Sequence, residues 1–135
     1  MREMEYTQNK IMIVDDDPDI VFSLKEILER EGFEVTSADN GRSCLKELEK
    51  GFQGIIILDL MMPIMDGIET IKHMTIDGFI ENNTIVVLTA KRIQGDEFNE
   101  IYPYIADFIL KPFDIKSFVA TVKKIASKPR QRHRF

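Results

Sequence analysis

The chain has 135 residues, of which 44% are hydrophobic and 30% charged, a composition that predicts one folded domain and excludes an intrinsically disordered chain. Its apolar runs, such as residues 55–58, are far too short to cross a bilayer, so no membrane association is expected. The formal net charge is −5, or −9 once the last eight residues, with four bases and no acid, are set aside, and an acidic body argues against direct nucleic-acid binding.

Apolar runs and helical patterns alternate five times along the chain. The predicted strands cover residues 11–14, 33–38, 55–58, 84–89 and 108–110. The predicted helices cover residues 18–31, 44–48, 67–77 and 94–102, with a last helix after residue 114. Asp17 before Pro18 is a typical helix start, and Asp114 can cap the last helix in the same way. Gly32 is placed to end the first helix, and Pro103 to end the fourth.

Uniformly apolar strands that alternate with helices predict a parallel sheet covered on both faces. Five such units favour the α/β class, as a flavodoxin-like doubly wound five-stranded parallel sheet of order 2-1-3-4-5 with helices on both faces. The expected organisation is a flexible N-terminal extension over residues 1–9, a single domain over 10–127 and a basic C-terminal tail over 128–135. The tail is interpreted as a solvated end or linker stub rather than as a site for an acidic partner or RNA.

Polar residues follow four of the five predicted strands at their carboxyl ends. The residues in question are Asp15, Asp16, Asp59, Thr89 and Lys111. Ligands bind at this edge of an open α/β sheet. Three carboxylates there repel one another unless a cation neutralises them. Because all the expected ligands are oxygens, the site favours Mg²⁺, with Mn²⁺ as the alternative, over zinc.

A carboxylate at such a site can accept a phosphoryl group as an aspartyl phosphate. Lys111 would supply a second positive charge, and Thr89 a hydroxyl donor. Each residue also has an ordinary structural explanation, since aspartates at strand ends commonly cap the next helix. The joint placement of all five at successive strand ends favours function over capping.

The same residues lie in segments that resemble the receiver domains of two-component response regulators, the CheY-like superfamily. These segments are residues 13–18 (IVDDDP), 58–63 (LDLMMP) with Asp66-Gly67, 88–90 (LTA) and 110–113 (LKPF). The resemblance covers about residues 9–127. It implies that Asp59 is the phosphoacceptor, that Asp16 binds Mg²⁺ directly and Asp15 through water, and that the backbone carbonyl of Met61 is a further ligand.

The resemblance also implies a conformational switch. Lys111 would bridge Asp59 and the phosphoryl group, and the Lys111–Pro112 peptide bond would be cis. Thr89 would move toward the phosphoryl oxygen, and Phe108 would turn inward behind it, changing the face made by the fourth helix, fifth strand and fifth helix. Met61 and Lys91 occupy the positions that tune phosphoryl lifetime. Since Met61 cannot orient an attacking water by hydrogen bonding, slow self-dephosphorylation is expected.

One part of the chain departs from the family pattern. Ile105-Ala106 stands where a Gly-Ala pair is common, and the bulky segment 102–104 (YPY) precedes it. These residues leave open the geometry of the fourth helix. The segment is interpreted as a cover for the core rather than as a partner-binding patch.

Three other functions remain as alternatives to a signalling switch that is not itself an enzyme. A phosphatase resembling haloacid dehalogenases would need a second aspartate where Met61 stands. A flavodoxin would need a Ser/Thr/Gly-rich phosphate loop where three aspartates lie. A degenerate receiver that serves only as a scaffold would not need the complete set of polar residues.

The partners expected from the resemblance are a histidine kinase or a histidine phosphotransfer protein. Downstream, the chain would act either alone on an unknown protein or as a fragment of a regulator with an output domain, and homodimerisation through the switch face is open. Cys44 is the only cysteine, which excludes an internal disulfide and fits a cytoplasmic location. His73 and His133 lie in no motif, so a phosphohistidine role is not expected.

Overall fold

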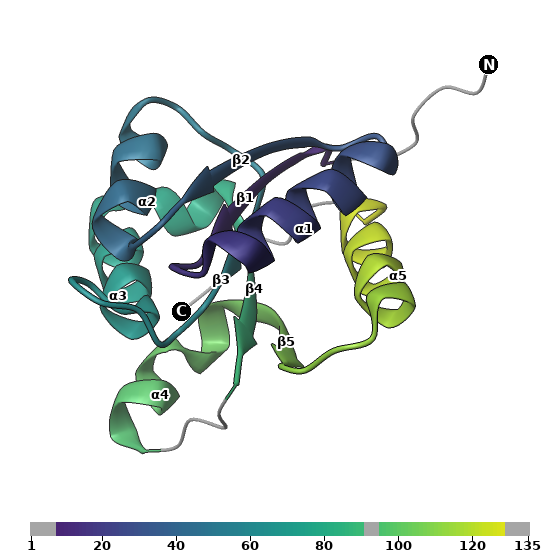
Figure 1. The fold of residues 1–135 in the computed structure, drawn as a ribbon. Coiled ribbons are helices and arrows are strands. Elements are labelled where there is room, and N and C mark those ends of the chain that lie inside the picture. The colour runs from purple at the N-terminus through teal and green to yellow at the C-terminus, as the bar shows by residue number, and fades with distance from the viewer. Residues whose placement is uncertain (1–7, 91–94, 129–135) are drawn as a thin grey trace.

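A computed structural model describes residues 8–90 and 95–128. It contains a five-stranded parallel sheet of order β2-β1-β3-β4-β5 (Figure 1). The strands are β1 (Lys10–Val14), β2 (Glu34–Ala38), β3 (Ile55–Leu58), β4 (Thr84–Thr89) and β5 (Ile105–Leu110). The expected fold class and strand order are therefore confirmed.

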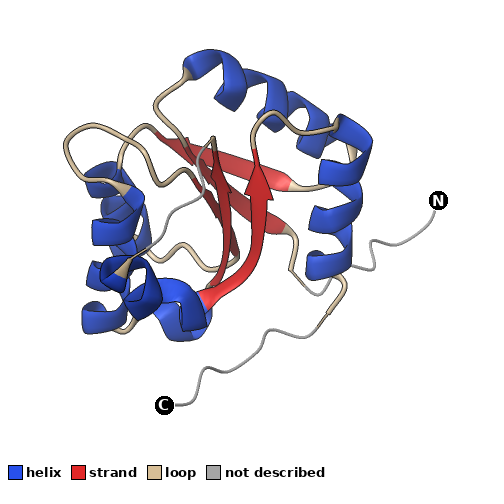
Figure 2. Cartoon of the chain, turned by 90° about the horizontal axis from the view of Figure 1, so that it is seen from below, coloured by secondary structure: helices blue, strands red, loops and turns tan. Residues whose placement is uncertain are grey.

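Helices connect the strands and cover both faces of the sheet (Figure 2). The α-helices are α1 (Pro18–Arg30), α2 (Gly41–Glu49), α3 (Gly67–Asp77), α4 (Asp96–Ile101) and α5 (Ile115–Ala126). Two short 3-10 helices, η1 (Phe79–Asn82) and η2 (Tyr102–Tyr104), precede β4 and β5. None of the helices in the described ranges is long and apolar enough to span a membrane.

Two apolar cores lie on opposite faces of the sheet. On one face, α2, α3 and α4 pack against β1, β3 and β4 through residues such as Cys44, Ile71 and Ile101. On the other face, α1 and α5 pack through residues such as Leu24 and Phe118. The central strands β1 and β3 contribute to both cores, which explains their uniformly apolar sequences.

Side-chain caps fix where the helices begin. Asp17 accepts a hydrogen bond from the backbone N–H of Asp19, and Asp114 accepts one from Ser117. Both caps match the sequence prediction. Each satisfies a backbone N–H that the first helical turn leaves without a partner. The strand-to-helix connections therefore end at defined residues beside the carboxyl edge of the sheet.

The strand register aligns the polar residues that follow the strands. Val14 pairs with Leu58 and with Ala38, and the N–H of Asp59 donates to the carbonyl of Val14 at 2.9 Å. Thr89 pairs with Leu110, and the N–H of Lys111 donates to the carbonyl of Thr89 at 2.8 Å. The residues after β1, β3 and β5 therefore reach the same edge as the end of β4.

The structure differs from the sequence prediction mainly around α4 and β5. The fourth helix is shorter than the predicted 94–102 and passes into η2 at Tyr102, while residue 94 lies outside the described residues. The fifth strand starts at Ile105 instead of Phe108. Hydrogen bonding to β4, with an irregular register between Ile85 and Val86, extends this strand beyond its apolar run.

The two tyrosines of segment 102–104 differ in whether they cover the core. Tyr104 packs against the core that α2, α3 and α4 cover, whereas Tyr102 is 62% exposed. The predicted covering role therefore holds for Tyr104 and not for Tyr102. Residues 1–7 and 129–135, most of the expected extension and tail, lie outside the described residues.

Candidate phosphoacceptor and metal site

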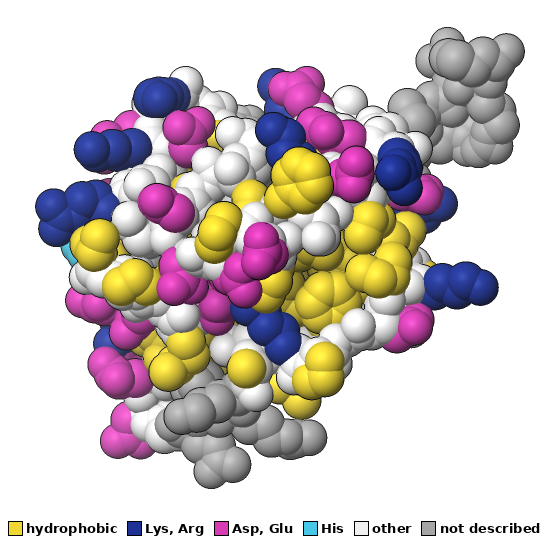
Figure 3. All heavy atoms as spheres, in the orientation of Figure 1, with side chains coloured by type: hydrophobic (Ala, Val, Ile, Leu, Met, Phe, Trp, Pro, Cys, Tyr) yellow, Lys and Arg dark blue, Asp and Glu magenta, His cyan; other side chains and the backbone are white. Residues whose placement is uncertain are grey.

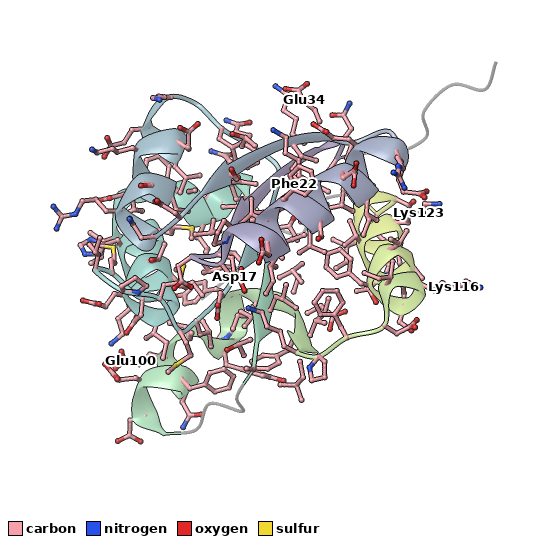
Figure 4. All side chains as sticks on the ribbon, viewed as in Figure 1. Asp17, Phe22, Glu34, Glu100, Lys116 and Lys123 are labelled. Carbon is pink, nitrogen blue, oxygen red and sulfur yellow. The ribbon has the colours of Figure 1, made fainter. Side chains whose placement is uncertain are left out.

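Three carboxylates meet at the carboxyl edge of the sheet. Oxygen atoms of Asp15, Asp16 and Asp59 all lie within 4.8 Å of one another. Asp15 is 2% exposed and Asp59 is 6% exposed, whereas Asp16 is exposed. Figure 3 shows acidic side chains gathered in this part of the surface, beside the N-terminal end of α1. Asp17, labelled in Figure 4 at the start of that helix, serves as its N-cap.

Backbone amides orient both buried carboxylates. The N–H of Met61 donates to Asp59 Oδ1 at 3.0 Å, and the N–H of Asp17 donates to Asp15 Oδ1 at 2.9 Å. Each bond leaves Oδ2 of its aspartate facing other partners. The two carboxylates are therefore held by the loops that follow β1 and β3 rather than by side-chain contacts alone.

Lys111 joins the two buried carboxylates. Its Nζ lies 2.8 Å from Asp15 Oδ2 and 3.2 Å from Asp59 Oδ2. Burial lowers the pKa of Lys111, but the hydrogen bond to Asp15 and the charges of both aspartates outweigh it, so the net shift is upward. The Lys111 ammonium group therefore forms ion pairs with both carboxylates. The peptide bond from Lys111 to Pro112 is cis.

The site as a whole carries more negative charge than its own cation neutralises. Burial raises the pKa of Asp15 above its ordinary 3.8, and this effect outweighs the lowering by Lys111 and by the Asp17 amide. The negative charge of Asp59 adds to the increase. An added cation would relieve this repulsion, because the three carboxylates offer oxygen ligands of the kind that Mg²⁺ prefers.

Thr89 contributes an unused hydrogen-bonding group. Its side chain is 0% exposed, and within residues 8–90 and 95–128 its Oγ1 is the only buried side-chain N or O atom without a hydrogen-bond partner. A buried hydroxyl without a partner is costly and is often explained by function. The donor set therefore fits a divalent cation, and Thr89 fits an oxygen-rich group beside it.

Phe108 lies on the same face of the sheet as Thr89. Val87 pairs with Phe108 across the sheet, and both contact the core that α2, α3 and α4 cover. Thr89 is two residues beyond Val87 on the same strand, so its side chain points to the same face. The Phe108 ring is half-buried and meets Phe98 of α4 edge-on, with ring centroids 5.9 Å apart. Phe98 in turn contacts Tyr102, at 5.6 Å. A row of aromatic rings thus links β5 to α4.

Of the two residues predicted to tune phosphoryl lifetime, Met61 lies in the described ranges. Met61 is 51% exposed beside Asp59, whereas Lys91 lies outside the described residues. Cys44 is fully buried and burial raises its pKa to about 12, so the thiol stays protonated and packs in the core. His73 is exposed on α3.

Sequence reasoning missed the packing role of Gly67. Its N–H donates to the carbonyl of Leu60, and a Cβ at this position would lie 2.7 Å from the carbonyl oxygen of Asp59. The loop after β3 can approach α3 this closely only because residue 67 is glycine. The Asp66-Gly67 pair was visible in the sequence, but its contact with the backbone of Asp59 was not.

Comparisons with known proteins point to one family. The family model named response regulator receiver domain matches residues 11–123. The transcriptional regulatory protein CpxR homolog of Haemophilus influenzae is 33% identical over 117 residues, covering 87% of this chain and 50% of that protein. The alkaline phosphatase synthesis transcriptional regulatory protein PhoP of Bacillus subtilis is 36% identical over 116 residues, covering 86% and 48%. The chain therefore spans about half the length of these curated relatives.

Solved structures agree with this result. A CheY-like response regulator receiver domain protein from Methanospirillum hungatei is 38% identical, with a TM-score of 0.81 over 87% of this chain and 93% of that one. The response regulator TrrA from Thermotoga maritima, solved in complex with Mg²⁺-BeF, is 29% identical, with a TM-score of 0.72 and coverage of 87% and 98%. The similarity extends over nearly all of both solved chains.

Proposed function

Because this chain belongs to the response regulator receiver domain family of two-component signalling, we propose that Asp59 is its phosphoacceptor and that phosphorylation switches the α4–β5–α5 face. The proposal rests mainly on one observation. Buried Asp59 lies within 4.8 Å of two further carboxylates, contacts Lys111 and shares its edge of the sheet with the unpaired hydroxyl of Thr89.

The residues that would hold Mg²⁺ are Asp15, Asp16, Asp59 and the backbone carbonyl of Met61. When bound, the ion supplies positive charge that offsets the carboxylates and the phosphoryl oxygens. Mn²⁺ prefers similar oxygen ligands and is the alternative ion. Asp15 and Asp59 are already oriented by backbone amides, so little rearrangement of these side chains is needed.

In the transfer step, a carboxylate oxygen of Asp59 forms a bond to phosphorus. The bond from phosphorus to the imidazole nitrogen of a phosphohistidine donor breaks, and the donor leaves as the free imidazole. Lys111 sits between Asp15 and Asp59 and can move from the pair onto a phosphoryl oxygen. The chain itself thereby provides the nucleophile and one positive charge.

The switch would follow from the unused hydroxyl of Thr89. A phosphoryl oxygen offers this group the hydrogen bond that it lacks. Movement of Thr89 vacates space on the face where Phe108 packs edge-on against Phe98. Because Phe108 has no phenolic hydroxyl, the change reaches α4 through packing alone.

The lifetime of the phosphorylated state would be long. Met61 has no group that orients an attacking water by hydrogen bonding, although its side chain is half exposed beside Asp59. We therefore infer slow self-dephosphorylation, with Lys91 as the second residue that tunes it. Turnover within seconds in the purified protein would contradict this part of the proposal.

The proposed phosphoryl donor is a histidine kinase or a histidine phosphotransfer protein in the cytoplasm. The curated relatives are named transcriptional regulatory proteins, and this chain matches about half of their length. We therefore propose regulation of transcription only for a longer protein that contains this domain. The alternative for the domain alone is contact with a separate target or with a second copy through the α4–β5–α5 face.

The direct test is incubation with acetyl phosphate and Mg²⁺, followed by intact-mass analysis. We expect one labile phosphoryl adduct that forms only when Mg²⁺ is present and is absent in Asp59→Asn. Asp19→Asn is the matched control, because Asp19 is an exposed carboxylate in the first turn of α1 outside the cluster. An adduct that persists in Asp59→Asn, or steady phosphate release from many phosphomonoesters, would instead favour a different acceptor or the phosphatase class.

A further inference from the structure

The helix α4 has few of the features that usually stabilise a short helix. It has six residues, and Gly95 before it provides no side-chain cap. Its sequence, DEFNEI, contains three acidic residues and no basic one. Glu97 and Glu100 are three residues apart on one side of the helix, where like charges repel. Glu100 also lies near the C-terminal end, where the helix dipole disfavours negative charge. Contacts with other elements are therefore needed to hold α4 in place.

Lys72 of α3 supplies one of these contacts. Its Nζ lies 3.4 Å from Glu97 Oε2 and 3.4 Å from Glu100 Oε2. Figure 4 labels Glu100, which lies between α4 and α3 in that view. The Lys72 side chain is 35% exposed, whereas the two glutamates are 73% and 62% exposed. One half-buried ammonium group thus offsets the repulsion between the two carboxylates and joins two helices that β4 separates in sequence.

Aromatic packing supplies the second contact, on another side of the helix. Phe98 follows Glu97 in sequence, so the two side chains leave the helix in directions about 100° apart. The Phe98 ring meets Phe108 of β5 with ring centroids 5.9 Å apart, whereas Glu97 meets Lys72. A movement of Phe108 would change the aromatic contact directly. The ion pairs to Lys72 would then remain to hold α4 where it is.

We propose that Lys72 is a positioning residue that holds α4 in its unphosphorylated arrangement and thereby opposes the switch. This inference rests on the proposed function, in which Phe108 turns inward and its packing against Phe98 changes. Both Nζ–Oε2 distances are long for hydrogen bonds, so displacement or rotation of α4 relative to α3 weakens at least one of them. An interaction that is stronger in one of two arrangements shifts the equilibrium toward that arrangement. Exposed ion pairs contribute modestly, so the expected effect is several-fold.

The test is Lys72→Met, which removes the charge and retains an unbranched apolar stem. Beryllium fluoride with Mg²⁺ serves as a reversible mimic of the phosphoryl group, and calorimetric titration measures its affinity. We expect Lys72→Met to bind it several-fold more tightly than the parent, because ligand binding and release of α4 are reciprocally linked. Without the ligand, the variant should be slightly less stable to urea, and the amide hydrogens of α4 should exchange faster. Tighter binding by a less stable protein is a combination that a merely structural contact does not produce.

Lys50→Met is the matched control. Lys50 pairs with Glu47 at 3.3 Å at the end of α2, so this variant also breaks a lysine–glutamate pair, but one within a single helix. It should leave the affinity for beryllium fluoride and the exchange of α4 unchanged. Lys72→Arg keeps the charge and should keep the parental affinity. Combining Lys72→Glu with Glu97→Lys and Glu100→Lys reverses all three charges, and it should restore most of what Lys72→Glu alone changes.

Three results would overturn the role of Lys72. They are parental or weaker affinity in Lys72→Met, equal gains in Lys72→Met and Lys50→Met, and a charge-reversed protein that behaves like Lys72→Glu alone. A parent protein that neither binds beryllium fluoride nor forms an adduct with acetyl phosphate would instead contradict the proposed function. The exchange of α4 in the unmodified protein then decides whether Lys72 holds this helix, and parental exchange in Lys72→Met would show that it does not.

Discussion

Thr89 gives the sharpest prediction at the scale of a single residue. Its hydroxyl is buried without a partner in the described structure, so Thr89→Val removes an unsatisfied group and keeps the side-chain shape. The unmodified protein should gain about 1 kcal/mol in free energy of unfolding, measured by urea denaturation. The phosphorylated variant should lose the change at Phe108 and α4, followed in ¹H–¹⁵N spectra.

Thr84 is the matched control on the same strand. Its hydroxyl donates to Gln8 Oε1 at 3.2 Å, so Thr84→Val breaks a hydrogen bond instead of removing an unpaired group. We expect its stability to fall slightly or stay level, and its response to phosphorylation to be intact. Thr89→Val could also destabilise the unmodified protein by as much as the loss of a hydrogen bond does. The Thr89 hydroxyl would then already have a partner, and its proposed role in the switch would be wrong.

Asp15 gives a prediction about pH. Burial is the main cause that raises its pKa in the fold above the ordinary 3.8. The unfolded chain therefore loses this proton first, and ionisation of Asp15 destabilises the metal-free fold as pH rises from 3.8 through the higher folded pKa. Asp15→Asn should thus be more stable than the parent at pH 7 without Mg²⁺. The difference should shrink toward zero below pH 3.8, as measured by urea denaturation across pH.

The polar residues of the site could be predicted from sequence because strand ends share an edge in a parallel sheet. That rule brings Asp15, Asp59 and Lys111 together from distant parts of the chain. The rule does not predict which carboxylate oxygen each hydrogen-bond donor contacts. The bond from the Met61 amide to Asp59 and the closer contact of Lys111 with Asp15 depend on loop conformation, which residue type alone does not determine.

At the scale of elements, prediction succeeded where a segment's own pattern decides its structure. The helix α3 runs from Gly67 to Asp77 as expected, because a capping box from Asp66 and Glu69 starts it and Gly78 ends it. The bounds of α4 and β5 depend on contacts with other segments. Lys72 of α3 lies 3.4 Å from carboxylates of both Glu97 and Glu100 on α4, a link that no local pattern predicts.

The connection from β3 to α3 gives the prediction at this scale. In Gly67→Ala, the added Cβ would meet the Asp59 carbonyl and the Leu60 backbone at 2.7 Å, and backbone atoms cannot move aside as a flexible side chain can. We expect a loss of about 1–3 kcal/mol in free energy of unfolding, together with weaker Mg²⁺ binding, since Asp59 and Met61 belong to the displaced loop. Denaturation and Mg²⁺ titration measure the two effects.

His73→Ala is the surface control on the same helix, because His73 is exposed and follows Gly67 by more than one helical turn. It should leave both stability and Mg²⁺ affinity nearly unchanged. A Gly67→Ala protein with parental affinity for Mg²⁺ would show that the position of this loop does not govern the site.

At the scale of the molecule, the two faces of the sheet separate two kinds of surface. The face covered by α2, α3 and α4 carries the row from Phe108 through Phe98 to Tyr102, which borders the proposed switch. The face covered by α1 and α5 carries a groove lined by apolar residues of both helices, such as Ile27 and Val119. The carboxylate site lies at the edge where both faces meet, so we expect phosphorylation there to alter the first surface.

A response of the whole molecule to Mg²⁺ follows from the same site. An ion that binds the folded chain and not the unfolded chain raises stability, by about 2.7 kcal/mol at 100 times its Kd. Thermal unfolding in MgCl₂ should therefore occur at higher temperature than in NaCl of equal ionic strength. Asp16→Asn should lose most of this shift with little effect on the metal-free fold, because Asp16 is exposed. Asp19→Asn, which removes a nearby charge outside the cluster, should keep it, and equal shifts in both variants would mean that Mg²⁺ acts by general screening and not at the three carboxylates.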